Sequence, residues 1–186
     1  MRDVFRYLNH TVAALLALVM FSLPSAAAET RLDTLFSQLD GAAPEEARRI
    51  ASEIEMEWAK SGSAAMDLLL RRGEDALEAG DTAAAVEHFS AAIDHAPGFA
   101  EAWHMRSVAF FRQEHYGLAL NDLAQAVVLE PRHFNAIFGM GRVFEETGRV
   151  ALAHEAFVQA RSIHPHHKSV SEALERVSRK LGGTDI

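Results

Sequence analysis

Three prolines recur at a constant interval in the second half of the chain. They are Pro97, Pro131 and Pro165, and each lies 34 residues after the one before. The other two prolines, Pro24 and Pro44, precede this region. A fixed period of about 34 residues is typical of a solenoid built from helix–turn–helix units. Such a period constrains the fold strongly, because each unit buries its apolar face only against its neighbours.

The composition fits a helical, packed protein. Hydrophobic residues make up 49% of the chain, which is enough for a core. Alanine, leucine, glutamate and arginine favour helices, and no long alternating run predicts a sheet. There is no cysteine, which excludes disulfides, thiolate metal sites and cysteine nucleophiles. The formal net charge of −8 disfavours binding to phosphate backbones, so we expect no nucleic-acid partner.

The N-terminus has the order of features found in secretory signal peptides. Arg2 and Arg6 are followed by a short apolar run at residues 12–23 and by small residues at 26–28. This order predicts a Sec-type signal peptide over residues 1–28 that is cleaved on export. The alternative is an uncleaved anchor, but the run is shorter than the roughly 20 residues that span a bilayer. We therefore expect a periplasmic or secreted protein of a Gram-negative bacterium, with no integral membrane segment after cleavage.

Aligning the chain on the three prolines gives three units without gaps, at residues 66–99, 100–133 and 134–167. Small residues share columns, because two helices approach closely only where side chains are small. These columns are Gly73, Ser107 and Gly141; Ala85, Ala119 and Ala153; and Ala92, Ala126 and Ala160. Large apolar residues fill the spaces between the helices, in the columns Leu69, Trp103 and Ile137, and Phe89, Leu123 and Phe157.

These columns resemble the tetratricopeptide repeat (TPR) pattern. The third unit matches it best, with Met140-Gly141, Phe144, the pair Ala153-x-x-x-Phe157, and Pro165. The resemblance implies an all-α, right-handed α-solenoid of stacked antiparallel helix hairpins. Arg72 and Arg106 depart from the pattern where leucine is usual, and their aliphatic stems can still cover apolar surface.

Segments on both sides of the repeats are also predicted to be helical. Residues 168–181 carry an apolar stripe that includes Val170, Leu174 and Val177, which is typical of a capping helix. Residues 182–186 are expected to form a mobile tail. Residues 29–65 are predicted to be a helical segment that stacks on the first repeat as a degenerate hairpin or cap. The alternatives are that this segment folds into the groove or binds a partner.

The resemblance implies that the first helix of each hairpin lines a concave, partner-binding groove. The groove residues that it implies are Leu70, Glu74, Leu77, Glu78, Glu101, His104, Val108, Phe111, Arg112, Asn135, Phe138, Arg142, Glu145 and Glu146. Their aromatic and acidic character suggests a protein or peptide partner with an apolar anchor and some basic residues. Phe111 and Phe138 could equally be ordinary contacts between repeats.

Some family members hold the C-terminal carboxylate of chaperones with a Lys/Asn/Arg clamp. The corresponding positions here are Leu70, Glu74, Met105, Asn135 and Gly139. Only the asparagine suits that role, so this activity is not expected.

No motif predicts an enzyme, a cofactor or a metal site. The chain has no GxSxG elbow and no phosphate-binding glycine loop. We therefore expect a non-catalytic protein-interaction module, an adaptor or assembly factor in the cell envelope. One alternative is a self-associating structural protein of unknown oligomeric state. The other is a metal-handling protein that uses His164, His166 and His167, although neighbouring residues on a helix point in different directions.

Overall fold

The computed structural model describes residues 30–182, and this part of the chain contains nine α-helices and no β-strand. The predicted signal peptide (1–28) lies outside the described residues, as do residues 183–186 of the predicted tail. Within the described range, no helix combines the length and the apolar character that crossing a membrane requires. The prediction of an all-α fold is confirmed.

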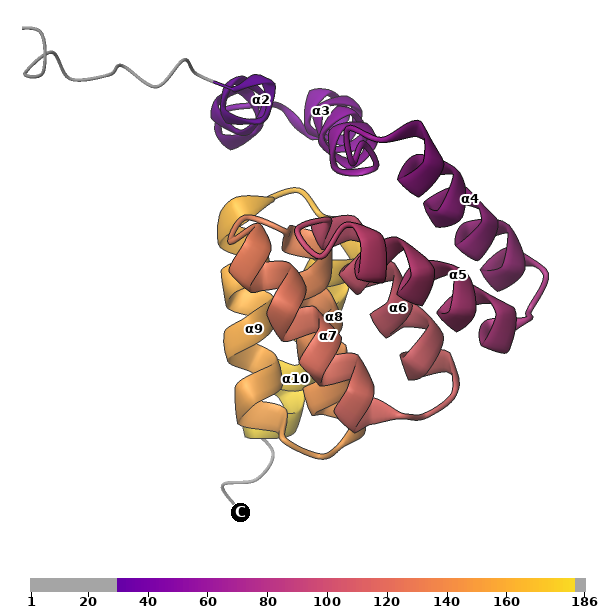
Figure 1. The fold of residues 1–186 in the computed structure, drawn as a ribbon. Coiled ribbons are helices and arrows are strands. Elements are labelled where there is room, and N and C mark those ends of the chain that lie inside the picture. The colour runs from indigo at the N-terminus through magenta and orange to yellow at the C-terminus, as the bar shows by residue number, and fades with distance from the viewer. Residues whose placement is uncertain (1–29, 183–186) are drawn as a thin grey trace, which may run out of the picture. The chain divides into compact units, whose positions relative to one another are not determined.

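Three antiparallel helical hairpins pack one after another in chain order (Figure 1). The pairs are α4 (Ala64–Glu78) with α5 (Thr82–His95), α6 (Ala100–Arg112) with α7 (Tyr116–Leu129), and α8 (Phe134–Glu146) with α9 (Val150–Ile163). Each of the three predicted repeat units holds one hairpin. The predicted solenoid of stacked hairpins is therefore present.

Small and large residues compensate one another inside each hairpin. A Cβ atom on Gly73 would lie 2.3 Å from the Phe89 ring, and one on Gly141 would lie 2.3 Å from the Phe157 ring. The second hairpin carries Ser107 in this column and the smaller Leu123 opposite it. The volume shared by each pair is thus nearly constant, which keeps the hairpins alike in spacing.

The turns inside the hairpins share one backbone feature and differ in sequence. Gly80 has a φ of 80° and Gly148 a φ of 74°, in the left-handed region that glycine adopts at helix ends. The second hairpin has Glu114 there, with a φ of 60°. Because a Cβ atom is unfavourable in this region, the second turn is under local strain.

The C-terminal helix α10 (Lys168–Gly182) closes the stack. Val170, Leu174 and Val177 are buried in one apolar cluster with Ile137 and Phe157 of the third hairpin. The outer side of α10 carries exposed charged residues. This is the arrangement predicted for a capping helix, and Gly182 is its last residue.

The N-terminal segment forms a separate pair of helices, α2 (Arg31–Asp40) and α3 (Pro44–Trp58). Their apolar faces bury one another through Leu35, Leu39, Ile50 and Ile54. Pro44 begins α3 and acidic residues follow it, as suits a helix N-terminus. Both helices therefore follow from ordinary amphipathic periodicity.

The α2–α3 pair packs where α7 leads into α8. The Trp58 and Phe134 ring centroids are 5.0 Å apart, Arg132 pairs with Asp33 at 2.9 Å, and Phe134 belongs to the apolar cluster of the pair. The sequence predicts a hairpin stacked on the first repeat. The contacts instead place it at this junction, because Trp58, the one aromatic residue of α3, packs against His133 and Phe134 there.

Candidate protein-binding groove

The first helices of the second and third hairpins, α6 and α8, together line a small hollow. Its walls are His104, Ser107, Val108, Phe111, Leu123, Gly139 and Arg142, and its volume is about 50 Å³. Since one water molecule takes about 30 Å³ in the liquid, the hollow has room for a small side-chain group. Four of the predicted groove residues, His104, Val108, Phe111 and Arg142, are brought together here.

The other three walls were absent from the predicted groove set. Ser107 and Leu123 belong to the small and large columns of the repeat, and Gly139 has a Cβ position only 2.9 Å from the Leu123 side chain. The repeat columns assign Ser107 and Leu123 to packing inside the hairpins, and Gly139 occupies one of the carboxylate-clamp positions. The small side chain of Ser107 and the missing side chain of Gly139 leave the hollow open, and these two small residues were the signal in the sequence that could have found it.

Arg142 and Phe111 form the rim of the hollow. The guanidinium carbon of Arg142 lies 4.4 Å from the centroid of the Phe111 ring, and Phe111 packs edge-on against Tyr116 at 5.5 Å. Cation–π attraction holds the guanidinium over the ring. Among the residues that the structure describes, no ion pair of Arg142 is found.

Three of the predicted groove residues face the protein's own core. Leu70 and Leu77 are buried in the core of the first hairpin, and Phe138 packs between the rings of Phe157 and His167 at 5.5 and 5.6 Å. The expectation that these side chains are free for a partner is therefore corrected. They lie on the side of α4 and α8 that turns toward the neighbouring helices.

Polar groove residues at both ends of the groove are also engaged within the chain. Arg112 donates a hydrogen bond to the carbonyl of Leu77 at 2.5 Å, at the end of α4. Asn135 donates to Glu55 of α3 at 2.7 Å. Glu78 and Glu146 remain exposed, and Glu74 is half-buried.

Glu145 is bound to the capping helix. Arg176 donates to its two carboxylate oxygens at 2.9 and 2.7 Å, and Lys180 donates to it at 2.7 Å. These contacts, with the Arg176 hydrogen bond first, lower the pKa of Glu145 to about 2 against the opposing effect of burial. The carboxylate thus joins α8 to α10.

A charged cluster joins the second and third repeats. Glu101 accepts from His133 Nε2 at 2.9 Å and contacts His104 Nδ1 at 3.1 Å. Burial by itself would raise the pKa of Glu101, but the charge and hydrogen bonds of His104 and His133 outweigh it and hold the pKa well below its usual range. Burial lowers the pKa of His133 despite the hydrogen bond to Glu101. Burial, and then the charge of Glu101, raises the pKa of Glu74.

His133 was not among the predicted site residues. It precedes α8 and its Nδ1 accepts a hydrogen bond from the Ala136 amide at 3.2 Å, so it caps that helix. The Trp58 ring stacks on it at 4.0 Å. The sequence did hold a signal, because His133 and His167 occupy the same repeat column.

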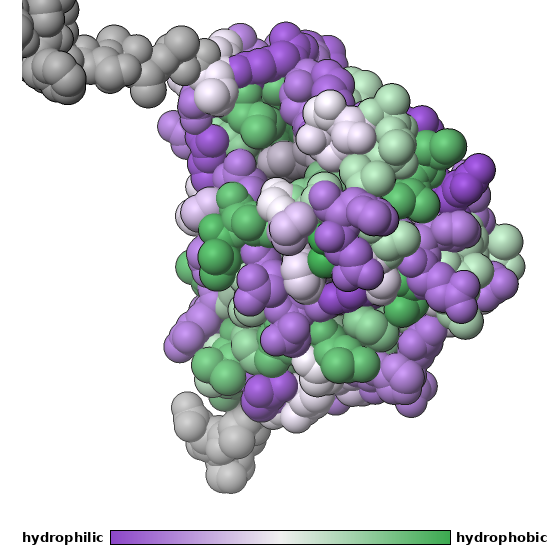
Figure 2. Space-filling model, viewed as in Figure 1, coloured by the Kyte–Doolittle hydropathy of each residue, from purple (hydrophilic) through white to green (hydrophobic). Residues whose placement is uncertain are grey.

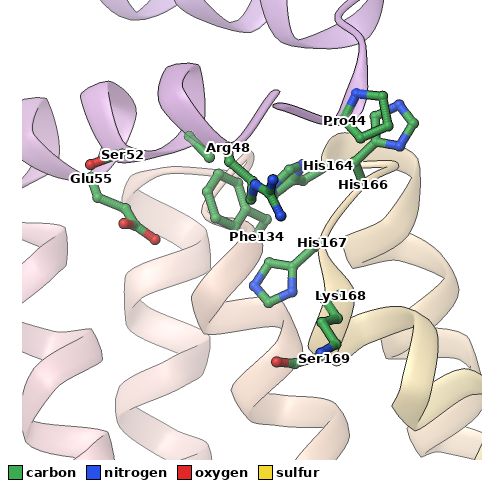
Figure 3. A pocket seen from close by; sticks show the side chains of 11 residues that line it. Pro44, Arg48, Ser52, Glu55, Phe134, His164, His166, His167, Lys168 and Ser169 are labelled. Atoms are coloured by element: carbon green, nitrogen blue, oxygen red, sulfur yellow. The ribbon is translucent and has the colours of Figure 1, made fainter. Parts of the chain in front are cut away.

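The C-terminal histidines line a second hollow of about 260 Å³ between α3 and the start of α10 (Figure 3). His164 is buried, His167 is half-buried and His166 is exposed. Burial, and then the neighbouring His167 and His166, lower the pKa of His164 to about 4. Figure 3 shows His166 beside Pro44, apart from His167. The ring nitrogens of these three residues do not converge in the described part of the chain as those of His104 and His133 do.

Comparison with known proteins identifies the class of this helical repeat protein. A family model described as tetratricopeptide repeat matches residues 70–127 and 104–167. A TPR repeat-containing protein of Rhizobium etli is 34% identical over 160 residues, which cover 86% of this chain and 78% of that protein. The chain belongs to the tetratricopeptide repeat family.

Solved structures share the same fold. The first TPR domain of Spaghetti (RPAP3), bound to an HSP90 peptide, is 19% identical with a TM-score of 0.63, and the match covers 64% of this chain and 95% of that one. The translocator chaperone SycD of Yersinia enterocolitica is 16% identical with a TM-score of 0.60, covering 63% and 95%. At these identities the likeness concerns the fold.

Proposed function

We propose that this protein is a non-catalytic protein-interaction module whose concave groove binds a protein segment. The observation that carries the proposal is the open hollow between α6 and α8, which four of the predicted groove residues line. An aromatic ring and a guanidinium at its rim are typical anchors of protein interfaces. The solved TPR domains with bound peptides support a binding role by analogy of fold.

The side chains that line the groove limit the kind of segment that it can bind. The hollow has apolar walls in Val108, Phe111 and Leu123, so it suits one small apolar side chain. Glu74 and Glu78 extend the groove along α4, and neither forms an ion pair within the described part of the chain. They favour basic residues in the neighbouring part of the bound segment. The partner is thus a segment with one apolar anchor flanked on the α4 side by basic residues.

The proposed location is the cell envelope. It rests on the signal-peptide pattern at residues 1–28. In that compartment the protein acts as an adaptor or assembly factor. Fractionation of cells that express the chain, with N-terminal sequencing of the product, tests this part. A product that begins near Glu29 in the periplasmic fraction supports it, and an uncleaved product in the cytoplasm rejects it.

The groove itself is tested by capture of partners in cells. Phe111→Ala removes the aromatic rim of the hollow, and Val158→Ala removes an exposed apolar side chain from α9 as a matched control. After cross-linking and purification, we expect the proteins captured by wild type to be lost from Phe111→Ala and retained by Val158→Ala. Equal capture by both variants would show that binding does not use the groove.

Self-association is the second candidate, because apolar side chains are exposed on the second helices of the hairpins. Leu118 and Val128 of α7 are 51% and 73% exposed, and Leu152 of α9 is 42% exposed. Figure 2 shows apolar residues scattered among polar ones on the face that it displays. Light scattering over a range of protein concentrations decides the matter. A constant monomer mass removes this candidate.

A further inference from the structure

Three metal-ligating side chains converge at the edge of the groove. A carboxylate oxygen of Glu101, a ring nitrogen of His104 and a ring nitrogen of His133 all lie within 4.8 Å of one another. Glu101 and His104 are three residues apart on α6, which places them on one face of that helix. His133 reaches the same point from the start of α8.

The third repeat contains the same arrangement without the charge. The residues 34 positions after Glu101, His104 and His133 are Asn135, Phe138 and His167. His167 Nε2 lies 3.4 Å from the Asn135 side-chain oxygen, and His167 Nδ1 accepts from the Val170 amide at 3.4 Å. A neutral amide and one histidine are therefore sufficient to hold the junction between a repeat and the next helix.

The second repeat has two ionisable side chains that the equivalent junction of the third repeat does not require. It replaces the amide by a carboxylate and the phenylalanine by a second imidazole, and both are mostly buried, with side chains 13% and 12% exposed. Burying a carboxylate is costly unless charge compensates it. Two imidazoles and one carboxylate form the ligand set that zinc uses in His₂Glu sites.

We infer that Glu101, His104 and His133 bind a divalent transition-metal ion of the zinc type. The ion bonds to the Glu101 carboxylate, His104 Nδ1 and His133 Nε2. Its remaining coordination position is open to water or to a group in the adjacent hollow, which His104 also lines. The site extends the expectation from sequence, which assigned metal binding only to His164, His166 and His167 as an alternative.

Metal binding moves one ring proton of His133 and weakens one helix cap. In the metal-free protein His133 Nδ1 accepts from the Ala136 amide, so Nε2 carries the ring proton and donates to Glu101. The metal takes the place of that proton at Nε2, and the neutral ring carries its proton at Nδ1 instead. The Ala136 amide then loses its acceptor.

The test is titration of the untagged protein, purified from cells expressing the full chain, with ZnCl₂ in a calorimeter at neutral pH. We expect one ion per chain with a Kd of about 1 μM or lower. Glu101→Gln keeps the shape of the side chain, and His104→Ala removes a ligand at the groove surface. Each should weaken binding by about 100-fold or more. Co²⁺ absorption in the visible region reports the same site independently.

The matched control is His166→Ala/His167→Ala, which removes two histidines and leaves the cluster intact. This variant should bind the first zinc ion as wild type does. Far-UV circular dichroism establishes that each variant is folded, and Glu101→Gln decides the outcome when His104→Ala does not fold. The inference is overturned when no stoichiometric binding is seen, or when binding survives Glu101→Gln but is lost in the control.

Discussion

The second and third repeats have the same backbone fold and differ in the side chains at equivalent positions. Positions that hold Arg106 and Asp122 in the second repeat hold Met140 and Ala156 in the third. The second repeat has Phe111 beside the hollow, and the third has Glu145 at the same position, where it forms ion pairs with Arg176 and Lys180 of α10. The period thus fixes the architecture, and departures from it decide which face of each repeat is free to bind.

The largest expected effect comes from breaking the buried ion pair of the second repeat. Arg106 donates to both oxygens of Asp122 at 2.7 and 2.9 Å, and Asp122 is 2% exposed. Arg106→Met leaves that carboxylate buried without its partner, so we expect a loss of about 3 kcal/mol in the free energy of unfolding. Urea denaturation followed by circular dichroism measures it.

The double variant Arg106→Met/Asp122→Ala gives the second repeat the residues of the third. It removes the buried charge together with its partner, so its stability should return to within about 1 kcal/mol of wild type. A double variant as unstable as the single one would show that the pair also shapes the packing around Trp103, over which the Arg106 guanidinium lies at 4.9 Å.

The next largest effect on stability is expected in the column of small residues that contains Gly141. Gly141→Ala places a Cβ atom 2.3 Å from the Phe157 ring, and we expect a loss of about 2 kcal/mol because this ring is fully buried. Adding Phe157→Leu pairs a small residue with a leucine, as Ser107 and Leu123 are paired in the second repeat, and should recover part of the loss. Thermal unfolding compares the two variants. If the second substitution deepens the loss, the compensation between the two columns does not hold.

Glu145 predicts a pH dependence that the second repeat lacks at this position. Its pKa falls from 4.5 to about 2 in the folded protein, so its stabilisation is present above pH 4.5 and disappears as pH falls toward 2. Arg176 and Lys180 are about half exposed, which limits the contribution to about 1 kcal/mol. Glu145→Gln should remove it at pH 7. Denaturation of both proteins at pH 7 and pH 3 should show their difference in stability shrinking at the lower pH.

The smallest effect is a gain. Glu114 occupies the left-handed position that Gly80 and Gly148 hold in the other hairpins. Glu114→Gly relieves the contact of its Cβ atom with the backbone, at some cost in the entropy of the unfolded chain. We expect a net stabilisation of about 0.5–1 kcal/mol. A parallel Glu87→Gly change inside α5 is the control and should destabilise by about 1 kcal/mol.

The repeats were predictable because their information is local and periodic. The columns of Gly73, Phe89 and their equivalents specify close approach and filling at fixed spacing, and they remain the packing residues in the structure. The capping helix followed from a single apolar stripe. These features depend on helix geometry, which the spacing of residues along the chain reports directly.

Features that depend on contacts between distant residues were less accessible. The sequence predicts only that the aliphatic stem of Arg106 covers apolar surface, whereas its guanidinium forms an ion pair with Asp122 on the partner helix. Leu70 and Leu77 were placed in the groove by analogy, but the rotation of α4 turns them inward. The position of α2 and α3 depends on the stacking of Trp58 on His133. No local sequence pattern specifies a contact between residues so far apart in the chain.

The stack of Trp58 on His133 gives the protein an intrinsic optical reporter. The chain has two tryptophans, and the other, Trp103, donates its indole N–H to the carbonyl of Pro97 at 3.0 Å. A Trp103→Phe background leaves a single fluorophore, whose ring centroid lies 4.0 Å from that of the imidazole. The fluorescence emission of Trp58 then reports in real time whether α2 and α3 remain packed against the repeats or detach from them.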